Sequence, residues 1–143
     1  MQLLNDLIDG ANLRGGEYAW PLDIFPEVLQ KAKSLELGCL GGQFQFRTQD
    51  STCEMYWLNA DPSGKTHEES WHQYVTRSCA EVLSAFSSLM SSTDFHVEAS
   101  RWSEIPELSG RNASPEEYLC FVAYFVNEAE LMKLREKATA LRR

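Results

Sequence analysis

The chain has 143 residues and a mass of 16.3 kDa, with 43% hydrophobic and 11% aromatic residues. This length is typical of a single domain, and the hydrophobic content excludes an intrinsically disordered chain. The formal net charge of −8 at pH 7 argues against nonspecific nucleic-acid binding and against docking on an anionic membrane. A basic protein is the more natural partner.

The charge is distributed unevenly along the chain. Residues 1–130 carry eight basic and twenty acidic side chains, a net charge of −12, whereas residues 131–143 carry five basic and one acidic, a net charge of +4. The acidity therefore belongs to the body of the domain.

The first part of the chain predicts two helices. Residues 2–9 place leucine and isoleucine side chains on one side of a short helix that ends near Gly10, and Gly15-Gly16 then interrupts the chain. From Pro21 onward, apolar residues recur at helical spacing and predict a helix at about 24–35.

A β-hairpin is predicted next. Residues 43–47 alternate polar and apolar, which is the period of a half-buried strand, and residues 52–58 are a second β-rich run. Residues 49–51 between them are typical of a turn. This hairpin places Phe44 and Phe46 on one face of the sheet and Gln43, Gln45 and Arg47 on the other.

A long helix is predicted over 67–91, where apolar side chains from Trp71 onward recur every three or four residues. Thr66 is the expected N-cap, because Glu69 stands three positions later, as in a capping box. Residues 95–99 alternate again and predict a strand.

The segment 118–126 is nearly all apolar, aromatic or β-branched, and it predicts a central strand covered on both faces, after one helical turn. A helix is the alternative, because residues 114–117 resemble a helix start. Asn127 and Glu130 form a cap-like pair that opens a last helix through Leu141. The element order predicts one α+β domain over 1–143, an antiparallel sheet of about four strands with helices packed mainly on one face.

The cysteines and the start of the chain favour a cytoplasmic protein. Cys39, Cys53, Cys79 and Cys120 include no C-x-x-C pair, so we interpret them as small buried hydrophobic residues rather than a zinc or redox motif. The first residues lack the basic and apolar regions of a secretory signal. No apolar stretch approaches the roughly 18 residues that span a bilayer. We therefore expect reduced thiols and no membrane partner.

The motifs that resemble catalytic or ligand sites have the wrong spacing. His67 and His72 are five residues apart, about 140° around a helix, whereas a zinc helix places its histidines four apart on one face. The glycine-rich segment 38–42 precedes a strand, where a phosphate-binding loop precedes a helix. We expect no catalytic residue, metal, cofactor or nucleic acid for this chain.

The tryptophans and their acidic neighbours are the candidate partner-binding residues. Trp71 begins the apolar stripe of the long helix and is expected in the core, whereas three others are expected to be partly exposed beside acids. Acids steer a basic protein toward such a surface and aromatic rings anchor it. Burial of these tryptophans in the core, with scattered surface charge, is the alternative. The predicted partner-binding residues are Trp20, Trp57, Asp61, Glu68, Glu69, Trp102 and Glu104.

Four segments carry a resemblance to a known type of protein: residues 17–21 (Glu-Tyr-Ala-Trp-Pro), 39–43 (Cys-Leu-Gly-Gly-Gln), 56–61 (Tyr-Trp-Leu-Asn-Ala-Asp) and 69–71 (Glu-Ser-Trp). With them the chain resembles small bacterial immunity proteins of polymorphic-toxin and contact-dependent inhibition systems. The resemblance implies a protein that binds a cognate toxin, often a basic nuclease, and blocks its active site.

Three hypotheses follow for the function. The first is a non-enzymatic, immunity-like protein that neutralises a basic toxin domain by covering its surface. The second is a small-molecule-binding or enzymatic α+β domain with a site between sheet and helices, recognisable by ionisable groups that converge in a cleft. The third is a homo-oligomer that associates through an exposed face of the sheet.

Overall fold

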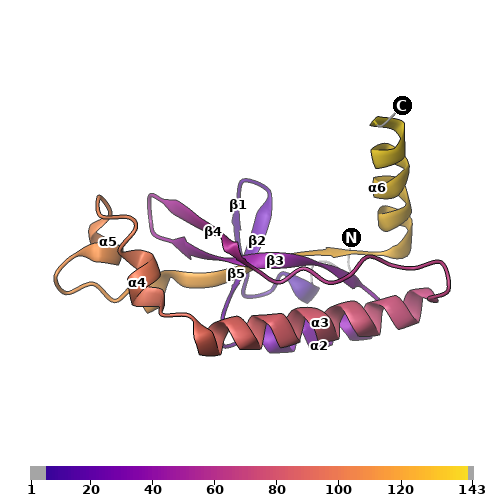
Figure 1. The fold of residues 1–143 in the computed structure, drawn as a ribbon, viewed down its shortest axis with the longest axis horizontal. Helices are drawn as coiled ribbons and strands as arrows, with labels where there is room; N and C mark the ends of the chain where they lie inside the picture. Colours follow the sequence, from indigo (N-terminus) through magenta and orange to yellow (C-terminus); the bar gives the residue numbers. More distant parts are fainter. Residues whose placement is uncertain (1–5, 142–143) are drawn as a thin grey trace.

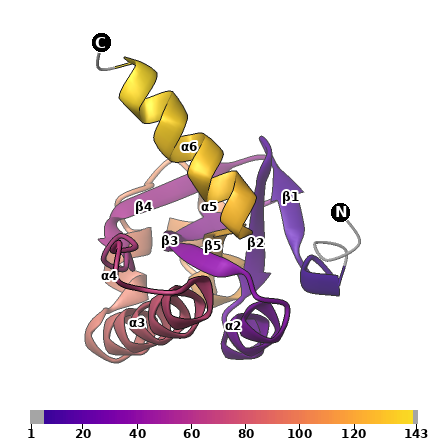
Figure 2. The ribbon, with the colours of Figure 1, turned by 90° about the vertical axis from the view of Figure 1, so that its right-hand side faces the viewer.

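The computed structural model describes residues 6–141, which form a five-stranded antiparallel sheet with two helices packed on one face (Figure 1 and Figure 2). The strands, in the spatial order β1-β2-β5-β3-β4, are β1 (Asn12–Arg14), β2 (Glu17–Pro21), β3 (Gly38–Arg47), β4 (Thr52–Asn59) and β5 (Leu119–Val126). The helices are α2 (Phe25–Ser34), α3 (Trp71–Ser92), α4 (Phe95–Ala99), α5 (Pro106–Ser109) and α6 (Glu128–Leu141), with a 3-10 turn η1 (Pro115–Tyr118) before β5. The α+β class is confirmed, with five strands in place of about four.

The additional pairing comes from Gly15 and Gly16. Both glycines have positive φ angles, 55° and 79°, as a two-residue hairpin turn requires. β1 and β2 pair antiparallel about this turn, with Leu13 opposite Tyr18. The glycine pair expected only to interrupt the chain is therefore the tip of a hairpin.

Aromatic side chains fill the space between the sheet and the helices. Trp20, Phe121 and Phe44 lie in register on the neighbouring strands β2, β5 and β3. Phe25 of α2 and Phe86 of α3 place their ring centroids 4.6 and 5.1 Å from that of Phe121. All five side chains are buried. The region in which the second hypothesis places a ligand site is thus packed with rings.

On the opposite face the sheet buries a charged side chain, Arg47, which is 8% exposed. Its Nε donates to Gln45 Oε1 at 3.0 Å, Nη1 to the Asn12 carbonyl at 2.7 Å and Nη2 to the Glu17 carbonyl at 3.2 Å. Because Asn12 and Glu17 belong to β1 and β2, Arg47 ties the N-terminal hairpin to β3. These bonds satisfy the buried guanidinium.

The helix predicted at about 24–35 and the hairpin predicted over 43–58 are confirmed, but the long helix begins at Trp71 rather than at residue 67. Its N-cap is Ser70, whose hydroxyl accepts from the Gln73 backbone at 3.1 Å while the Gln73 side chain accepts from the Ser70 backbone at 2.8 Å. Glu69 accepts from the Thr66 backbone at 3.0 Å, as predicted, and also from the Arg77 guanidinium, but no helix begins directly after Thr66. The later of two capping sequences therefore starts the helix.

The strand predicted over 95–99 is wrong, because these residues form helix α4. Asp94 is the N-cap, and its Oδ1 accepts from the backbone of His96 at 3.1 Å and of Val97 at 3.2 Å. Phe95 and Ala99, one helical turn apart, both pack on the core, whereas Val97 is 60% exposed. An alternation over only five residues is compatible with a strand and with one turn of helix, and the hydrogen bonds of the Asp94 N-cap stabilise the helix.

The strand predicted over 118–126 is confirmed as β5, which follows the turn η1 and lies between β2 and β3. It is central in the sheet but not covered on both faces, since Tyr124 is 41% exposed. Asn127 and Glu130 cap α6 as predicted, each side chain accepting from the other's backbone at 2.8 Å. The central position of β5 links the N-terminal hairpin to the β3–β4 hairpin.

The helix predicted over residues 2–9 begins outside the described residues. Within them, Asp6 and Leu7 are helical, and Gly10 has a φ of 80°. Leu7 is buried, and its carbonyl accepts a hydrogen bond from Trp20 Nε1 at 3.0 Å. This bond fixes the N-terminal segment to the sheet.

Candidate partner-binding surface

A bulge in the edge strand β4 exposes aromatic side chains at one surface of the protein. Along β3, Phe44 pairs with Met55, but its neighbour Gln43 pairs with Asn59. Residues 56–58 of β4 therefore have no partner on β3. A bulge of this kind bends the strand and turns its side chains out of the regular alternation.

The bulge exposes two adjacent aromatic side chains, Tyr56 and Trp57, which are 69% and 38% exposed. It is closed by Asn59, whose Nδ2 donates to the Tyr56 carbonyl at 2.9 Å. Regular pairing resumes where the Ala60 backbone donates to the Gly42 carbonyl at 2.9 Å. The bulge is thus held by hydrogen bonds at its end, and both rings face outward.

Trp57 is held in place by neighbouring rings. It stacks on Trp102, with centroids 6.3 Å apart and planes at 16°, and Trp102 meets the buried ring of Phe46 edge-on at 5.9 Å. Tyr56 meets Trp57 edge-on at 5.0 Å. We call Tyr56, Trp57 and Trp102 the aromatic surface. Its inner ring rests on the core and its outer rings reach solvent.

Charged groups from α4 and the residues after it complete the arrangement. The Arg101 guanidinium lies 4.9 Å from the Trp57 ring centroid, within the range of a cation–π contact. Glu98 Oε2 accepts from Arg101 Nε at 2.7 Å and from Trp57 Nε1 at 3.3 Å. The Trp57 ring therefore has its orientation fixed by a stacking ring, a cation and a hydrogen bond.

The structure brings together two of the predicted residues, Trp57 and Trp102, whose rings stack. Glu104 is exposed two positions after Trp102. The pKa of the Cys53 thiol in β4 is raised mainly by burial and secondarily by the negative charge of Glu104. The expectation that Trp20 is partly exposed is wrong, because it is 1% exposed. Its position in β2 turns it toward the helices, where its ring centroid lies 6.2 Å from that of Phe25.

The predicted acids Asp61, Glu68 and Glu69 do not join the aromatic surface. Glu68 and Glu69 precede α3, a helix of 22 residues, whereas Trp102 follows its other end. Such a helix is about 33 Å long. Hydrogen bonds from Arg77 lower the pKa of Glu69 to about 2, so this carboxylate holds the loop before α3. Asp61 is exposed beyond the bulge.

Sequence reasoning missed Tyr56, Glu98 and Arg101 as parts of this surface. One signal was present, since residues 55–58 are four consecutive apolar or aromatic residues and break the period of two expected for an edge strand. Glu98 and Arg101 became neighbours of Trp57 only because residues 95–99 form a helix. A strand there would have separated them along an extended chain.

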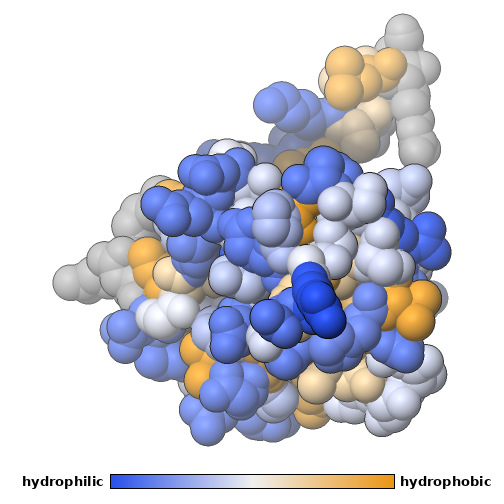
Figure 3. Space-filling model, turned by 90° about the vertical axis from the view of Figure 1, so that its left-hand side faces the viewer, coloured by the Kyte–Doolittle hydropathy of each residue, from blue (hydrophilic) through white to orange (hydrophobic). Residues whose placement is uncertain are grey.

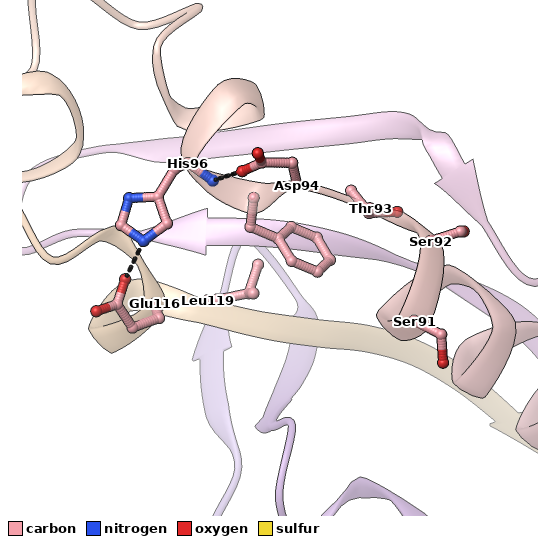
Figure 4. A pocket seen from close by; sticks show the side chains of 8 residues that line it. Ser91, Ser92, Thr93, Asp94, His96, Glu116 and Leu119 are labelled. Atoms are coloured by element: carbon pink, nitrogen blue, oxygen red, sulfur yellow. Dashed lines mark hydrogen bonds and ion pairs between the residues drawn. The ribbon is translucent and has the colours of Figure 1, made fainter.

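A hollow of about 580 Å³ lies between the end of α3, α4 and η1 (Figure 4). Its polar groups are engaged in the fold: Asp94 caps α4, and the hydroxyls of Ser91 and Ser92 donate to carbonyls of the preceding helical turn. Figure 4 shows the His96 ring directed at Glu116, with Nε2 and Oε2 3.1 Å apart. These groups stabilise the local structure rather than converge on a ligand.

The thiols behave as buried apolar groups in three of four cases. Cys39, Cys53 and Cys79 are buried, as expected, whereas Cys120 is partly buried, and all four are free. Burial raises the pKa of Cys79 to about 11. Within residues 6–141, no three His, Cys, Asp or Glu side chains are grouped to hold a metal, and no helix of that part is long and apolar enough to cross a membrane.

Comparison of the chain with protein-family models, with curated proteins and with solved structures finds no match in any of the three. The aromatic surface and the charge of the chain are therefore the features that bear on function.

Proposed function

We propose that this chain is a non-enzymatic, immunity-like binding protein that neutralises a cognate bacterial toxin domain, and that the aromatic surface is its contact. The observation that carries the proposal is the bulge that exposes Trp57 while Trp102, Glu98 and Arg101 hold it. Tryptophan, tyrosine and arginine are the residue types that contribute most at protein interfaces. Because the ring is fixed before binding, association costs little side-chain entropy.

The charge of the chain supports a basic partner. Residues 1–130 have a net charge of −12, Glu98 accepts a hydrogen bond from the Trp57 ring, and Glu104 is exposed two positions after Trp102. Around α4 and α5 the surface is mostly hydrophilic, with hydrophobic side chains apart from one another (Figure 3). Aromatic anchors within a polar, acidic rim are typical of an interface that forms between separately folded proteins.

The experiment compares tagged wild-type protein with the Trp57→Ala variant in affinity capture from the lysate of the bacterial host. Leu13→Ala is the matched control, because Leu13 is 53% exposed on the edge strand β1 at the other side of the sheet. We expect a basic protein to be retained by wild type and by Leu13→Ala, and to be lost with Trp57→Ala. Its retention should weaken as salt rises.

Capture is followed by a test of neutralisation. The retained protein is expressed alone in a bacterial host, where we expect it to arrest growth, and then together with wild type or Trp57→Ala. Rescue by wild type but not by the variant supports the proposal. A retained protein that does not arrest growth, or that is rescued equally by Trp57→Ala, contradicts it.

A further inference from the structure

The last helix, α6, projects from the body of the protein (Figure 1 and Figure 2). It contacts the body through its first turn and through Arg135, whose Nη2 donates to the Lys65 carbonyl at 2.8 Å. Only Leu131, in its first turn, is buried, where it packs with Tyr74 and Val126. Further along, Leu134 is 48% exposed and Leu141 is 85% exposed. A helix of 14 residues is close to the limit of about 12–15 residues below which an isolated helix is marginal in water. Most of α6 thus lacks the packing that usually stabilises a helix of this length.

Four apolar residues of α6 lie along one side of the helix, and of these Leu131 is buried at its foot whereas Leu134 and Leu141 are exposed. Leu131, Leu134, Ala138 and Leu141 are spaced by three, four and three residues, as in the seam of a paired helix. Met132, which is 58% exposed, lies about 160° around the helix from Leu134. In Figure 3 the far end of α6, next to the grey C-terminal residues, carries hydrophobic side chains. We call Leu131, Leu134, Ala138 and Leu141 the α6 stripe.

The stripe borders an apolar groove at the foot of the helix. This groove, of about 300 Å³, is lined by Leu134 together with residues of β2, β3 and β5, among them Tyr18, Leu40, Tyr124 and Val126. The exposed apolar side of α6 is therefore continuous with the apolar groove on the body of the protein. A helix lying along the stripe would reach this groove with its end.

The charges that flank the stripe indicate which helix fits. Glu128 and Glu130 lie on its two sides near the start of α6, and Arg135 and Lys137 lie on the corresponding sides further along. When two such helices run antiparallel, Glu128 of each comes beside Arg135 of the other, and Glu130 beside Lys137. A parallel pair would also bring Glu130 of each helix beside Arg135 of the other, but only the antiparallel pair carries the end of each helix to the groove of the other copy. The helix is therefore complementary in charge to a second copy of itself, and the groove favours the antiparallel orientation.

We propose that α6 pairs antiparallel with α6 of a second copy of this chain, the stripes packing together and the end of each helix reaching the groove of the other copy. The result is a two-fold symmetric dimer, in which the same surface is used by both copies. In Figure 1, α6 and α4 lie at opposite ends of the molecule, so this dimer leaves the aromatic surface free. The proposal is independent of the toxin proposal.

The test is the mass of the purified full chain, measured by sedimentation equilibrium over a wide range of concentration. We expect wild type to approach twice 16.3 kDa as concentration rises. Leu141→Asp should shift the dimer dissociation constant by about tenfold or more, because it places a charge in the stripe. Met132→Asp is the matched control, with a similarly exposed residue on the far side of α6, and should leave the mass of wild type unchanged.

A charge exchange separates pairing of α6 from a loss of helix. One variant carries Glu128→Lys with Glu130→Lys, and the other carries Arg135→Glu with Lys137→Glu. Each alone should be monomeric, whereas their mixture should form a heterodimer visible by native mass spectrometry. A wild type that stays at 16.3 kDa, a dimer insensitive to Leu141→Asp, or a mixture that stays monomeric overturns the proposal.

Discussion

Replacing Gly42 by alanine tests the fit between the central strands and the end of the bulge. Gly42 pairs with Ala123 of β5 on one side and exchanges backbone hydrogen bonds with Ala60 on the other. A Cβ at this position would lie 1.9 Å from the Val122 carbonyl oxygen and 3.0 Å from the Ala123 Cα. An ordinary carbon–oxygen contact is about 3.3 Å or longer, so backbone on the central strand must move by more than 1 Å.

Overpacking of this kind costs roughly 1–3 kcal/mol, and the upper end applies because the obstructing atoms are backbone. We expect Gly42→Ala to lower the free energy of unfolding by about 3 kcal/mol. For a domain of this size, that corresponds to a fall in Tm of about 10 °C. Since total stability is about 5–15 kcal/mol, the variant should fold but unfold at much lower denaturant concentration.

Two other glycines supply controls for urea unfolding followed by tryptophan fluorescence. Gly16 has open space around it but a φ of 79°, so Gly16→Ala should cost only about 1 kcal/mol of backbone strain. Gly64 has no strained φ, and its nearest neighbour is Arg135 Nη2 at 3.6 Å, so Gly64→Ala should be close to neutral. If Gly42→Ala costs no more than Gly16→Ala, the described packing of β3 against β5 is incorrect.

Three further predictions concern the bulge, the loop before α3 and the thiols. Asn59→Ala removes the hydrogen bond that closes the bulge and should lower the free energy of unfolding in urea by about 1 kcal/mol; no change would show that the bulge is held without it. Arg77 lowers the pKa of Glu69 to about 2 from an ordinary 4.5, so its stabilisation is complete above pH 4.5 and is lost as pH falls toward 2. The urea midpoints of wild type and Glu69→Gln should therefore differ at pH 7 and converge near pH 2, and a constant difference would contradict this assignment. Burial raises the pKa of Cys39 and Cys79, so at pH 8 a thiol reagent should modify both only after denaturant is added, and rapid reaction in the native protein would refute their burial.

Local patterns in the sequence predicted a segment correctly where its residue propensities and its packing in the fold favour the same secondary structure. The helix at about 24–35 follows helical periodicity, and the strand over 118–126, for which a helix was the alternative, was favoured by its aromatic and β-branched residues. The segment 95–99 failed because five residues are too few for periodicity to distinguish a strand from one turn of helix. There the hydrogen bonds of the Asp94 side chain decided the structure.

The candidate site was only half predictable from the sequence. Trp57 and Trp102 were expected at a partner surface, but their stacking depends on the register of β4 against β3, which the sequence does not encode locally. The same limit explains Trp20, which neighbours polar residues in the sequence yet faces the core. A tryptophan's neighbours along the chain do not determine which side of the sheet it occupies.

The most direct test of the central claim is the affinity of the captured partner, proposed here to be a toxin domain, for wild type, Trp57→Ala and Leu13→Ala, measured by isothermal titration calorimetry. Loss of an anchoring tryptophan typically costs about 2 kcal/mol or more, which is about 30-fold in the dissociation constant. We therefore predict that Trp57→Ala weakens binding by about 30-fold or more while Leu13→Ala binds like wild type. Unchanged affinity for Trp57→Ala would contradict the assignment of the aromatic surface as the contact.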